Sequence, residues 1–199
     1  TGGVVMGQPF GTMDTRTRLI LYGLRYMAEN GTDNISLRKI AAECGVSCAA
    51  PYKHFEDKDD FIAAIIQYVA DKWTEIANGI INEYPDDMRK QLVEISMAYI
   101  DFLVKYPYFR SVIMAGFESK NDEIEAQKKI SPVSSGIIKE YIKKYNIDEK
   151  TCMERMFLIR SMIYGAALML DNGQLEYNAA VKEMIRNLLD KAVSMEICD

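Results

Sequence analysis

The sequence predicts an all-α protein of about nine helices. Apolar residues recur three and four positions apart along nearly the whole chain, which is the spacing of amphipathic helices. Alternating β-branched runs joined by Asn-Gly turns, which would indicate hairpins, are absent. The apolar runs stay short of the roughly 18 residues of a transmembrane helix, so we expect no membrane partner. With 199 residues, the chain is long enough for one large domain or two small ones.

The first helix is expected over residues 15–30, ending at the Asn30-Gly31 pair. Its buried face should contain Leu19, Ile20, Gly23, Leu24 and Met27. Residues 1–13 carry no charge and are rich in glycine, so we expect a disordered leader or a cloning remnant there.

A helix-turn-helix is predicted within residues 36–55, which read SLRKIAAECGVSCAAPYKHF. Ser36 can cap the helix that follows it, and Gly45 can end that helix in a tight turn. Ser47 is then placed to cap a third, short helix. In such a unit the second helix of the pair enters the major groove, with its N-terminal side chains toward the bases.

The rest of the chain divides at its helix-breaking residues. Pro85, Pro107 and the Asn172-Gly173 pair separate stretches with helical periodicity. The expected helices cover residues 58–81, 85–106, 108–116, 132–145, 149–172 and 178–195.

Charge is distributed unevenly along the chain. The whole protein has a net charge of −5, but residues 14–54 contain six basic and four acidic side chains. That segment is therefore +2 and the remainder is −7. A mildly basic head on an acidic body is typical of a DNA-binding module joined to a domain that does not bind DNA.

Cysteine and histidine usage argues against metal sites and catalysis. The four cysteines form no C-x-x-C pair, and His54 is the only histidine. We therefore expect no metal, no cofactor and no disulfide framework, in a reducing cytoplasm. Because no acid–base pair or nucleophile triad is evident, we expect the protein not to be an enzyme.

Residues 15–65 resemble the N-terminal domain of the tetracycline-repressor (TetR) family of transcriptional regulators. The resemblance rests on a first helix ending at Gly31, on the Gly-Val-Ser turn at residues 45–47, and on Tyr52, His54-Phe55 and Lys58 at the family's spacing. It implies these DNA-binding residues: Ser36, Arg38, Ser47, Cys48, Ala49, Ala50, Tyr52, Lys53, His54 and Lys58.

Small residues at positions 48–50 permit close approach to base edges, and Tyr52 and Lys53 suit phosphate oxygens. Two residues depart from the family's pattern. Pro51 lies inside the expected recognition helix, where it removes a backbone donor and can distort the turn. Cys48 replaces a residue that is often basic or polar.

The resemblance implies a helix-turn-helix DNA-binding domain over residues 14–60 and an effector-binding and dimerisation domain over residues 61–199. The implied function is a ligand-responsive transcriptional regulator. It would be a repressor that binds a palindromic operator as a homodimer and is released by a small lipophilic or aromatic effector. The alternative is a helical adaptor that binds a partner protein, which predicts weak DNA binding without sequence preference.

Soft and aromatic side chains gather in the middle helices, as they do in pockets for flat or lipophilic ligands. Plain core packing is the competing interpretation for each of them. The expected pocket residues are Tyr99, Phe102, Tyr106, Phe109, Met114, Phe117, Met156, Phe157, Arg160 and Tyr164. Because a buried arginine needs a partner, we expect Arg160 to pair with Asp101 or Glu118, or with a ligand carboxylate.

In the family that the chain resembles, the last two helices pair with their copies in a second protomer. Small residues would allow close helix contact there, and larger apolar residues would supply buried area. The implied dimer-interface residues are Met162, Gly165, Ala166, Met169, Ile185, Leu188 and Leu189. An intramolecular core is the alternative for each of them.

Overall fold

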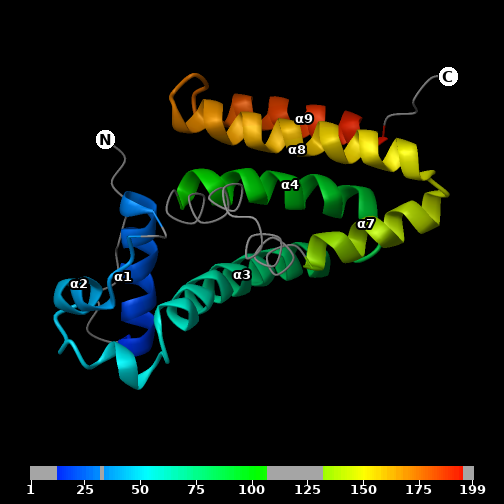
Figure 1. Ribbon diagram of the computed structural model, residues 1–199. Coiled ribbons are helices and arrows are strands. Elements are labelled where there is room, and N and C mark those ends of the chain that lie inside the picture. The colour runs from blue at the N-terminus through cyan, green and yellow to red at the C-terminus, as the bar shows by residue number, and fades with distance from the viewer. Residues whose placement is uncertain (1–12, 32–33, 107–131, 195–199) are drawn as a thin grey trace. The chain divides into compact units, whose positions relative to one another are not determined.

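The computed structural model describes residues 13–31, 34–106 and 132–194, and within these ranges it contains helices and no strand (Figure 1). The predicted all-α class is confirmed. No helix in the described ranges combines the length and hydropathy that a bilayer-spanning segment requires. The described residues form two compact units: residues up to Lys72 with Tyr106, and residues 73–105 with 132–194. The domain boundaries expected after residues 13 and 60 stay predictions.

The first unit contains α1 (Thr15–Asn30), α2 (Leu37–Glu43) and a 3₁₀ helix, η2 (Pro51–Lys53). α1 begins where expected because the Asp14 carboxylate accepts hydrogen bonds from the backbone N–H and the hydroxyl of Thr17, at 3.0 and 2.6 Å. The α1 face that the sequence predicts to be buried, including Leu19 and Ile20, is buried.

The helix α3 (Lys58–Glu83) begins in the first unit and ends in the second. Within the first unit its Phe61 and Ile65 side chains are fully buried and lie against Gly23 of α1. A Cβ atom at position 23 would lie 2.7 Å from Phe61 Cε1 and 2.8 Å from Ile65 Cδ1, so this crossing requires glycine. Phe61 also packs edge-on against Phe55, with the ring centroids 4.8 Å apart.

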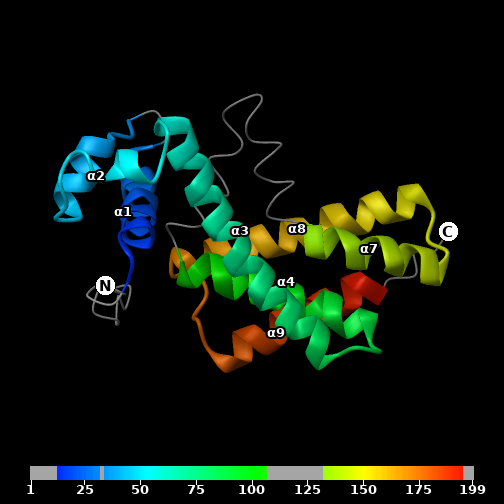
Figure 2. The ribbon, with the colours of Figure 1, turned by 90° about the horizontal axis from the view of Figure 1, so that it is seen from below.

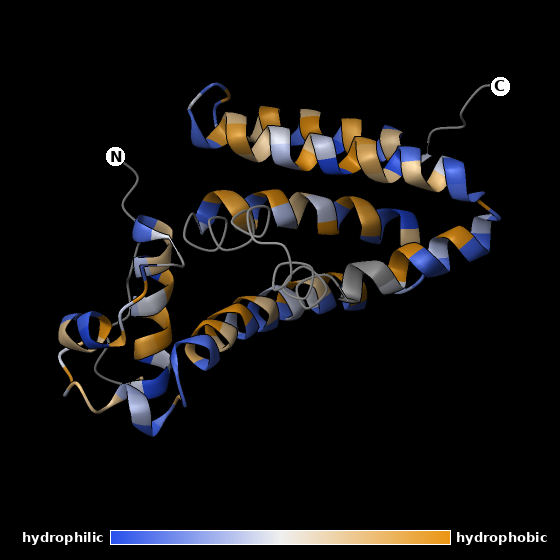
Figure 3. Cartoon of the chain, viewed as in Figure 1, coloured by the Kyte–Doolittle hydropathy of each residue, from blue (hydrophilic) through white to orange (hydrophobic). Residues whose placement is uncertain are grey.

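The second unit is built around α4 (Met88–Lys105). This helix contacts α7 (Pro132–Tyr145), α8 (Glu149–Asp171) and α9 (Ala179–Ser194). Figures 1 and 2 show α8 and α9 side by side. The core of this unit includes Ile100, Leu103, Ile163 and Leu189. Figure 3 shows hydrophobic and hydrophilic residues together on each helix, as amphipathic packing requires.

A row of three ion pairs joins α4 to α9. The pairs are Arg89–Asp190, Glu94–Arg186 and Asp101–Lys182, with N···O distances of 2.6, 2.8 and 3.0 Å. The residue numbers rise along α4 as they fall along α9, so the two helices are antiparallel. All six side chains keep some exposure to water, which limits the stabilisation that each pair supplies.

The start of one helix differs from its prediction by three residues, and the other boundaries differ by less. The helix expected from residue 85 begins at Met88, because the Asp87 carboxylate accepts a hydrogen bond of 2.9 Å from the backbone N–H of Lys90 and so caps the helix. The residues just before Asp87 therefore form the turn. The helix expected over residues 108–116 lies outside the described residues.

Candidate nucleic-acid interface

The turn after α2 has the hydrogen bonds of a Schellman motif. The N–H of Gly45 donates to the Ala42 oxygen at 3.1 Å, and the N–H of Val46 donates to the Ala41 oxygen at 3.0 Å. Gly45 has a φ of +72°, which glycine adopts readily and other residues adopt at a cost. Gly45 therefore ends α2 as predicted and turns the chain sharply.

Arg18 of α1 supports the same turn from the neighbouring helix. Its Nη2 atom donates a hydrogen bond of 2.6 Å to the backbone oxygen of Cys44, the residue that caps α2. Carbonyl groups at a helix C-terminus are unsatisfied and partly negative, which suits a guanidinium partner. Burial raises the pKa of the Cys44 thiol, and the Arg18 charge opposes that rise. We could not select Arg18 from the sequence, because no pattern distinguishes it from Arg16 or Arg25.

The recognition segment, residues 47–54, is not the short α-helix that the sequence predicts. An α-helix capped by Ser47 would need the N–H of residue 51 to bond to the Ser47 oxygen, and Pro51 has no N–H. The N–H of Ala50 donates to that oxygen instead, at 2.9 Å, and two further N–H groups of the segment also donate to oxygens three residues earlier. This pattern is that of a 3₁₀ helix, which corrects the prediction for this element.

The recognition segment nevertheless presents the predicted DNA-binding side chains to solvent. Pro51 and Phe55 are buried and hold the segment against the first unit, whereas Tyr52 is exposed. Ala50 is half-buried. The other exposed residues are Ser47, Cys48, Ala49, Lys53 and His54. The outward surface of the segment thus combines small side chains with polar and basic ones.

Three further predicted residues lie at the starts of helices. Ser36 caps α2 by accepting a hydrogen bond of 3.4 Å from the backbone N–H three residues later. Arg38 is exposed in the first turn of α2, and Lys58 is the half-buried first residue of α3. Arg16, which we did not select from the sequence, lies 5.4 Å from the centroid of the Phe55 ring and adds a cation beside the recognition segment.

In the second unit, two of the residues predicted for the effector pocket share an aromatic neighbour. The ring centroid of Trp73 lies 4.7 Å from that of Tyr99 and 5.7 Å from that of Phe102. Burial, the charge of Tyr164 and a hydrogen bond with Tyr164 raise the pKa of Tyr99, and Arg160 opposes the rise. We did not select Trp73 for the pocket, because its only sequence signal is a place in the apolar stripe of a helix.

The other predicted pocket residues are not gathered in this way. Phe157 is 75% exposed, so the single chain does not enclose it, contrary to the prediction. Tyr106 and Met156 are half-buried. Phe109, Met114 and Phe117 lie outside the described residues.

Arg160 is exposed, which corrects the expectation of a buried arginine. Asp101, one of its expected partners, accepts a hydrogen bond of 2.7 Å from the Tyr177 hydroxyl and one of 3.0 Å from Lys182. Both of its carboxylate oxygens are engaged, and the Arg160–Asp101 pair does not form. Glu118, the other expected partner, lies outside the described residues. The expectation of burial fails because α8 has apolar side chains on more than one face.

Two of the predicted dimer-interface residues belong to the core of the chain itself. Ile185 and Leu189 are 4% and 0% exposed in the single chain, because their face of α9 packs within the second unit against α4 and α8. They have almost no surface left to bury against a second copy, which corrects their assignment. Met169 and Leu188 are nearly half exposed. Met162, Gly165 and Ala166 are half-buried.

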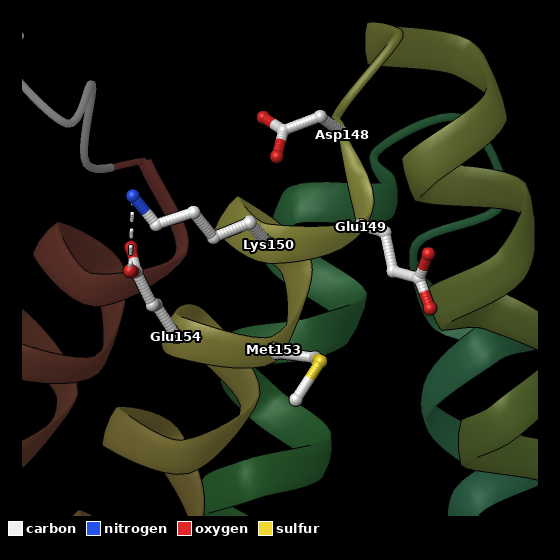
Figure 4. A pocket seen from close by; sticks show the side chains of 5 residues that line it. All are labelled: Asp148, Glu149, Lys150, Met153 and Glu154. Atoms are coloured by element: carbon white, nitrogen blue, oxygen red, sulfur yellow. Dashed lines mark ion pairs between the residues drawn. The ribbon is translucent and has the colours of Figure 1, made fainter.

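A surface depression of about 540 Å³ lies at the start of α8 (Figure 4). It is lined by Asp148, Glu149, Lys150, Met153 and Glu154. Lys150 pairs with Glu154 at 4.0 Å, and Asp148 caps the helix by accepting a hydrogen bond of 3.0 Å from the N–H of Thr151. This charged lining does not suit a lipophilic effector. Elsewhere in the described ranges, as here, no three Cys, His, Asp or Glu side chains are grouped as metal ligands would be.

Comparisons with known proteins relate the first unit to a family of bacterial regulators. Residues 20–65 match the sequence model described as "Bacterial regulatory proteins, tetR family". An HTH-type transcriptional regulator of Staphylococcus aureus (strain bovine RF122 / ET3-1) is 24% identical over 112 residues, which are 56% of this chain and 58% of the relative. The chain therefore spans less than two thirds of the length of the curated relatives that it matches.

Solved structures share the fold of both units. A TetR family transcription regulator from Marinobacter aquaeolei VT8 has a TM-score of 0.70 at 18% identity, covering 89% of this chain and 94% of that one. The transcriptional regulator FadR from Bacillus subtilis, solved in complex with stearoyl-CoA, has a TM-score of 0.64 at 19% identity, covering 88% of this chain and 98% of that one. At these identities the likeness shows the fold alone.

Proposed function

We propose that this chain, which belongs to the tetR family of bacterial regulatory proteins, is a ligand-responsive DNA-binding transcriptional regulator. The observation that carries the proposal is the recognition segment. It follows a glycine turn, is anchored by the buried Pro51 and Phe55, and exposes its small, polar and basic side chains. This is the arrangement that a helix-turn-helix uses to enter the major groove.

Within the interface we assign two kinds of contact. Cys48, Ala49 and Ala50 are small enough to approach base edges and the methyl groups of thymine. Ser36, Arg38, Ser47, Tyr52, Lys53, His54 and Lys58 contact the phosphates, with His54 able to reach a base as well. Phosphate contacts fix the register of the protein on the duplex without specifying sequence. Specificity is therefore expected from positions 48–50.

The regulator acts as a homodimer that pairs through α8 and α9. Leu158, Met162, Gly165 and Met169 follow one another at helical spacing along α8, and Gly165 allows close approach of a second helix. On α9, Leu188 and Met184 are exposed one turn apart. A twofold dimer would place two recognition segments about one DNA turn apart, which matches a palindromic operator.

The effector is a small lipophilic molecule that binds the second unit and releases the operator. We place it beside the cluster of Trp73, Tyr99 and Phe102, in which the first and last rings are buried and Tyr99 is half-buried. FadR of Bacillus subtilis, a structure of the same fold, holds stearoyl-CoA, which supports a lipophilic ligand for this chain too. Since effector and operator favour different conformations, each weakens binding of the other by the same factor.

We assign a binding role and no catalytic one, with no cofactor or metal required. In the second unit, three acidic and three basic side chains form ion pairs between α4 and α9 and are engaged with one another. A regulator of transcription works where the chromosome is, so we place the protein in the cytoplasm.

The function is tested by selecting bound duplexes from a random DNA pool and titrating the winner at several salt concentrations. We expect a palindromic sequence bound by one dimer, with affinity falling steeply as salt rises. Lys150→Ala removes one positive charge from an exposed side chain of α8, outside the proposed interface. It is the control for variants that remove a positive charge from the DNA-facing side chains. No enrichment above background would contradict the proposal, and weak binding without sequence preference would favour the adaptor.

A further inference from the structure

Two apolar stripes run along different sides of α8. The first, Leu158, Met162, Gly165 and Met169, follows the spacing i, i+4, i+7, i+11. Arg155 lies one turn before this stripe and donates a hydrogen bond of 3.3 Å to the backbone oxygen of Val193 at the end of α9. The first stripe therefore lies on the side of α8 that is next to α9, where the proposed dimer forms.

The second stripe has the same spacing and contains a single cation. Its apolar members are Met153, Phe157, Tyr164 and Leu168, and Arg160 lies between them at i+7 from Met153. Met153, Phe157 and Leu168 are all more than half exposed. Tyr164 is close enough to Tyr99 of α4 to raise its pKa, and α8 packs against α4, so this second stripe lies on the α4 side of α8.

The charge of Arg160 is not balanced within the described part of the chain. Its expected partner Asp101 is held by Tyr177 and Lys182, at 2.7 and 3.0 Å. No carboxylate of the described residues forms an ion pair with Arg160. An accessible guanidinium is suited to binding a carboxylate through two parallel hydrogen bonds.

An aromatic cluster lies beside this cation. Burial raises the pKa of Tyr99, and the Arg160 charge opposes that rise. The ring centroids of Tyr99 and Trp73 lie 4.7 Å apart. Phe102, one turn of α4 further on, also contacts Trp73 at 5.7 Å. The surroundings of Arg160 are thus apolar and aromatic on the α4 side and apolar along α8.

We propose that Arg160 is the anion-binding residue of the effector site, and that the effector is an apolar acid whose chain lies along the second stripe of α8. The inference rests on the proposed function, because it names the ligand class of that effector site. The stripe from residue 153 to 168 is about 22 Å long, so the apolar surface on either side of Arg160 measures about 10–12 Å. These lengths fit a medium-chain acid bound by its carboxylate at Arg160.

A second copy of the chain is a poorer occupant of this stripe. A twofold interface centred on Arg160 would bring the two Arg160 guanidinium groups toward each other in an apolar setting, where like charges repel. The first stripe carries no charged side chain and has no such penalty. Charge complementarity therefore favours an acid on the second stripe and a protomer on the first.

The test measures ligand binding without DNA. Trp73 is the only tryptophan of the chain and lies in the aromatic cluster, so its fluorescence reports binding there. Decanoate and its neutral counterpart decan-1-ol are titrated into the full-length parent, Arg160→Gln and the control Lys150→Gln. We expect the parent and the control to bind decanoate at least about tenfold more tightly than the alcohol, since a charge-assisted hydrogen bond is gained.

Arg160→Gln should bind the alcohol as the parent does and lose the preference for the acid. The proposal is overturned if the parent binds neither probe, binds both equally, or keeps its preference in Arg160→Gln. It is also overturned if decanoate changes the oligomeric state of the parent without changing Trp73 fluorescence. Failure of the regulator function would appear separately, as absence of sequence-specific DNA binding in a protein that still prefers the acid.

Discussion

Two glycines of the first unit are required for different physical reasons. Gly23 has an ordinary helical backbone, but a Cβ atom there would overlap the side chains of Phe61 and Ile65. Gly45 has open space within 4 Å of its would-be Cβ, but its φ of +72° is unfavourable for a residue with a side chain. One site is limited by packing between α1 and α3, and the other by the conformation of the turn.

This difference predicts opposite responses to asparagine, which tolerates positive φ but is larger than alanine. Gly45→Ala should lower the free energy of unfolding by about 1–2 kcal/mol, and Gly45→Asn should recover part of that loss. Gly23→Ala should cost about 1–3 kcal/mol through overpacking, and Gly23→Asn more. Urea unfolding followed by far-UV circular dichroism measures all four. Equal losses for Asn and Ala at both sites would contradict the distinction.

The DNA-facing side chains should separate into two groups by their effect on salt dependence. Lys58→Ala should weaken binding on every sequence and flatten the slope of log affinity against log salt by about one unit, because one phosphate contact is lost. Tyr52→Ala should weaken binding uniformly. Ala49→Ser should change which operator is preferred and leave the slope unchanged. Fluorescence anisotropy on the selected operator and a scrambled duplex distinguishes these outcomes. Parent-like binding by all three variants would refute the assignment of the site.

Single residues differ in how far the sequence reveals them. Gly45, Ser36 and Tyr52 could be predicted because each occupies a position with a local rule: a helix end, a cap, or an exposed place after the turn. Arg18 could not, since its partner is the backbone oxygen of Cys44, which is brought near only by folding. The prediction that Arg160 is buried was wrong, because apolar neighbours in sequence indicate burial only when a helix has one apolar face.

At the scale of elements, helix starts depend on aspartate caps that titrate in acid. The carboxylates of Asp14 and Asp148 accept hydrogen bonds from Thr17 and Thr151 respectively, which lower their pKa below the usual 3.8. Since the folded pKa lies below the unfolded one, the stabilisation is complete above about pH 4 and is lost as pH falls through the folded pKa. Both caps are exposed, so salt and water moderate the effect.

The caps predict a pH-dependent difference between matched variants. Asp14→Ala/Asp148→Ala should unfold at a lower temperature than the parent at neutral pH, and the gap should narrow between about pH 4 and pH 3. Asp14→Asn/Asp148→Asn keeps an oxygen acceptor that does not titrate, so it should lose less stability than the parent over the same interval. Thermal melts across this pH range provide the measurement. A gap that stays constant in acid would show that these caps do not carry the stabilisation.

The recognition segment is an element whose position could be predicted from the sequence but whose helix type could not. Its position after a glycine turn is predictable from residues 36–47, but its 3₁₀ geometry follows from one missing N–H at Pro51. The sequence contains that proline, yet the consequence depends on which carbonyl the absent donor would have reached. The helix from Met88 is similar, since Asp87 rather than the preceding proline defines its start.

At the scale of the whole molecule, the two stripes of α8 explain why dimer and effector residues could not be separated from sequence. Apolar residues surround this helix, so periodicity indicates burial without indicating by what. The contacts of Arg155 with α9 and of Tyr164 with Tyr99 distinguish the two sides. Ile185 and Leu189 lie on α9 and contribute to neither surface, because both are buried in the core of the single chain.

The assembly can therefore be tested with one substitution on each side. Leu188→Glu places two copies of a carboxylate near each other in the proposed twofold interface, where desolvation and like charge oppose pairing. We expect it to be monomeric in light scattering and to bind the operator about a hundredfold more weakly, since both half-sites are no longer engaged together. Leu168→Glu adds the same charge to the second stripe, so it should remain a dimer with parent-like DNA affinity and bind decanoate poorly. A dimeric Leu188→Glu or a monomeric Leu168→Glu would contradict this assignment of the two faces. Each substitution changes one exposed leucine and leaves the core intact, so neither result would follow from unfolding.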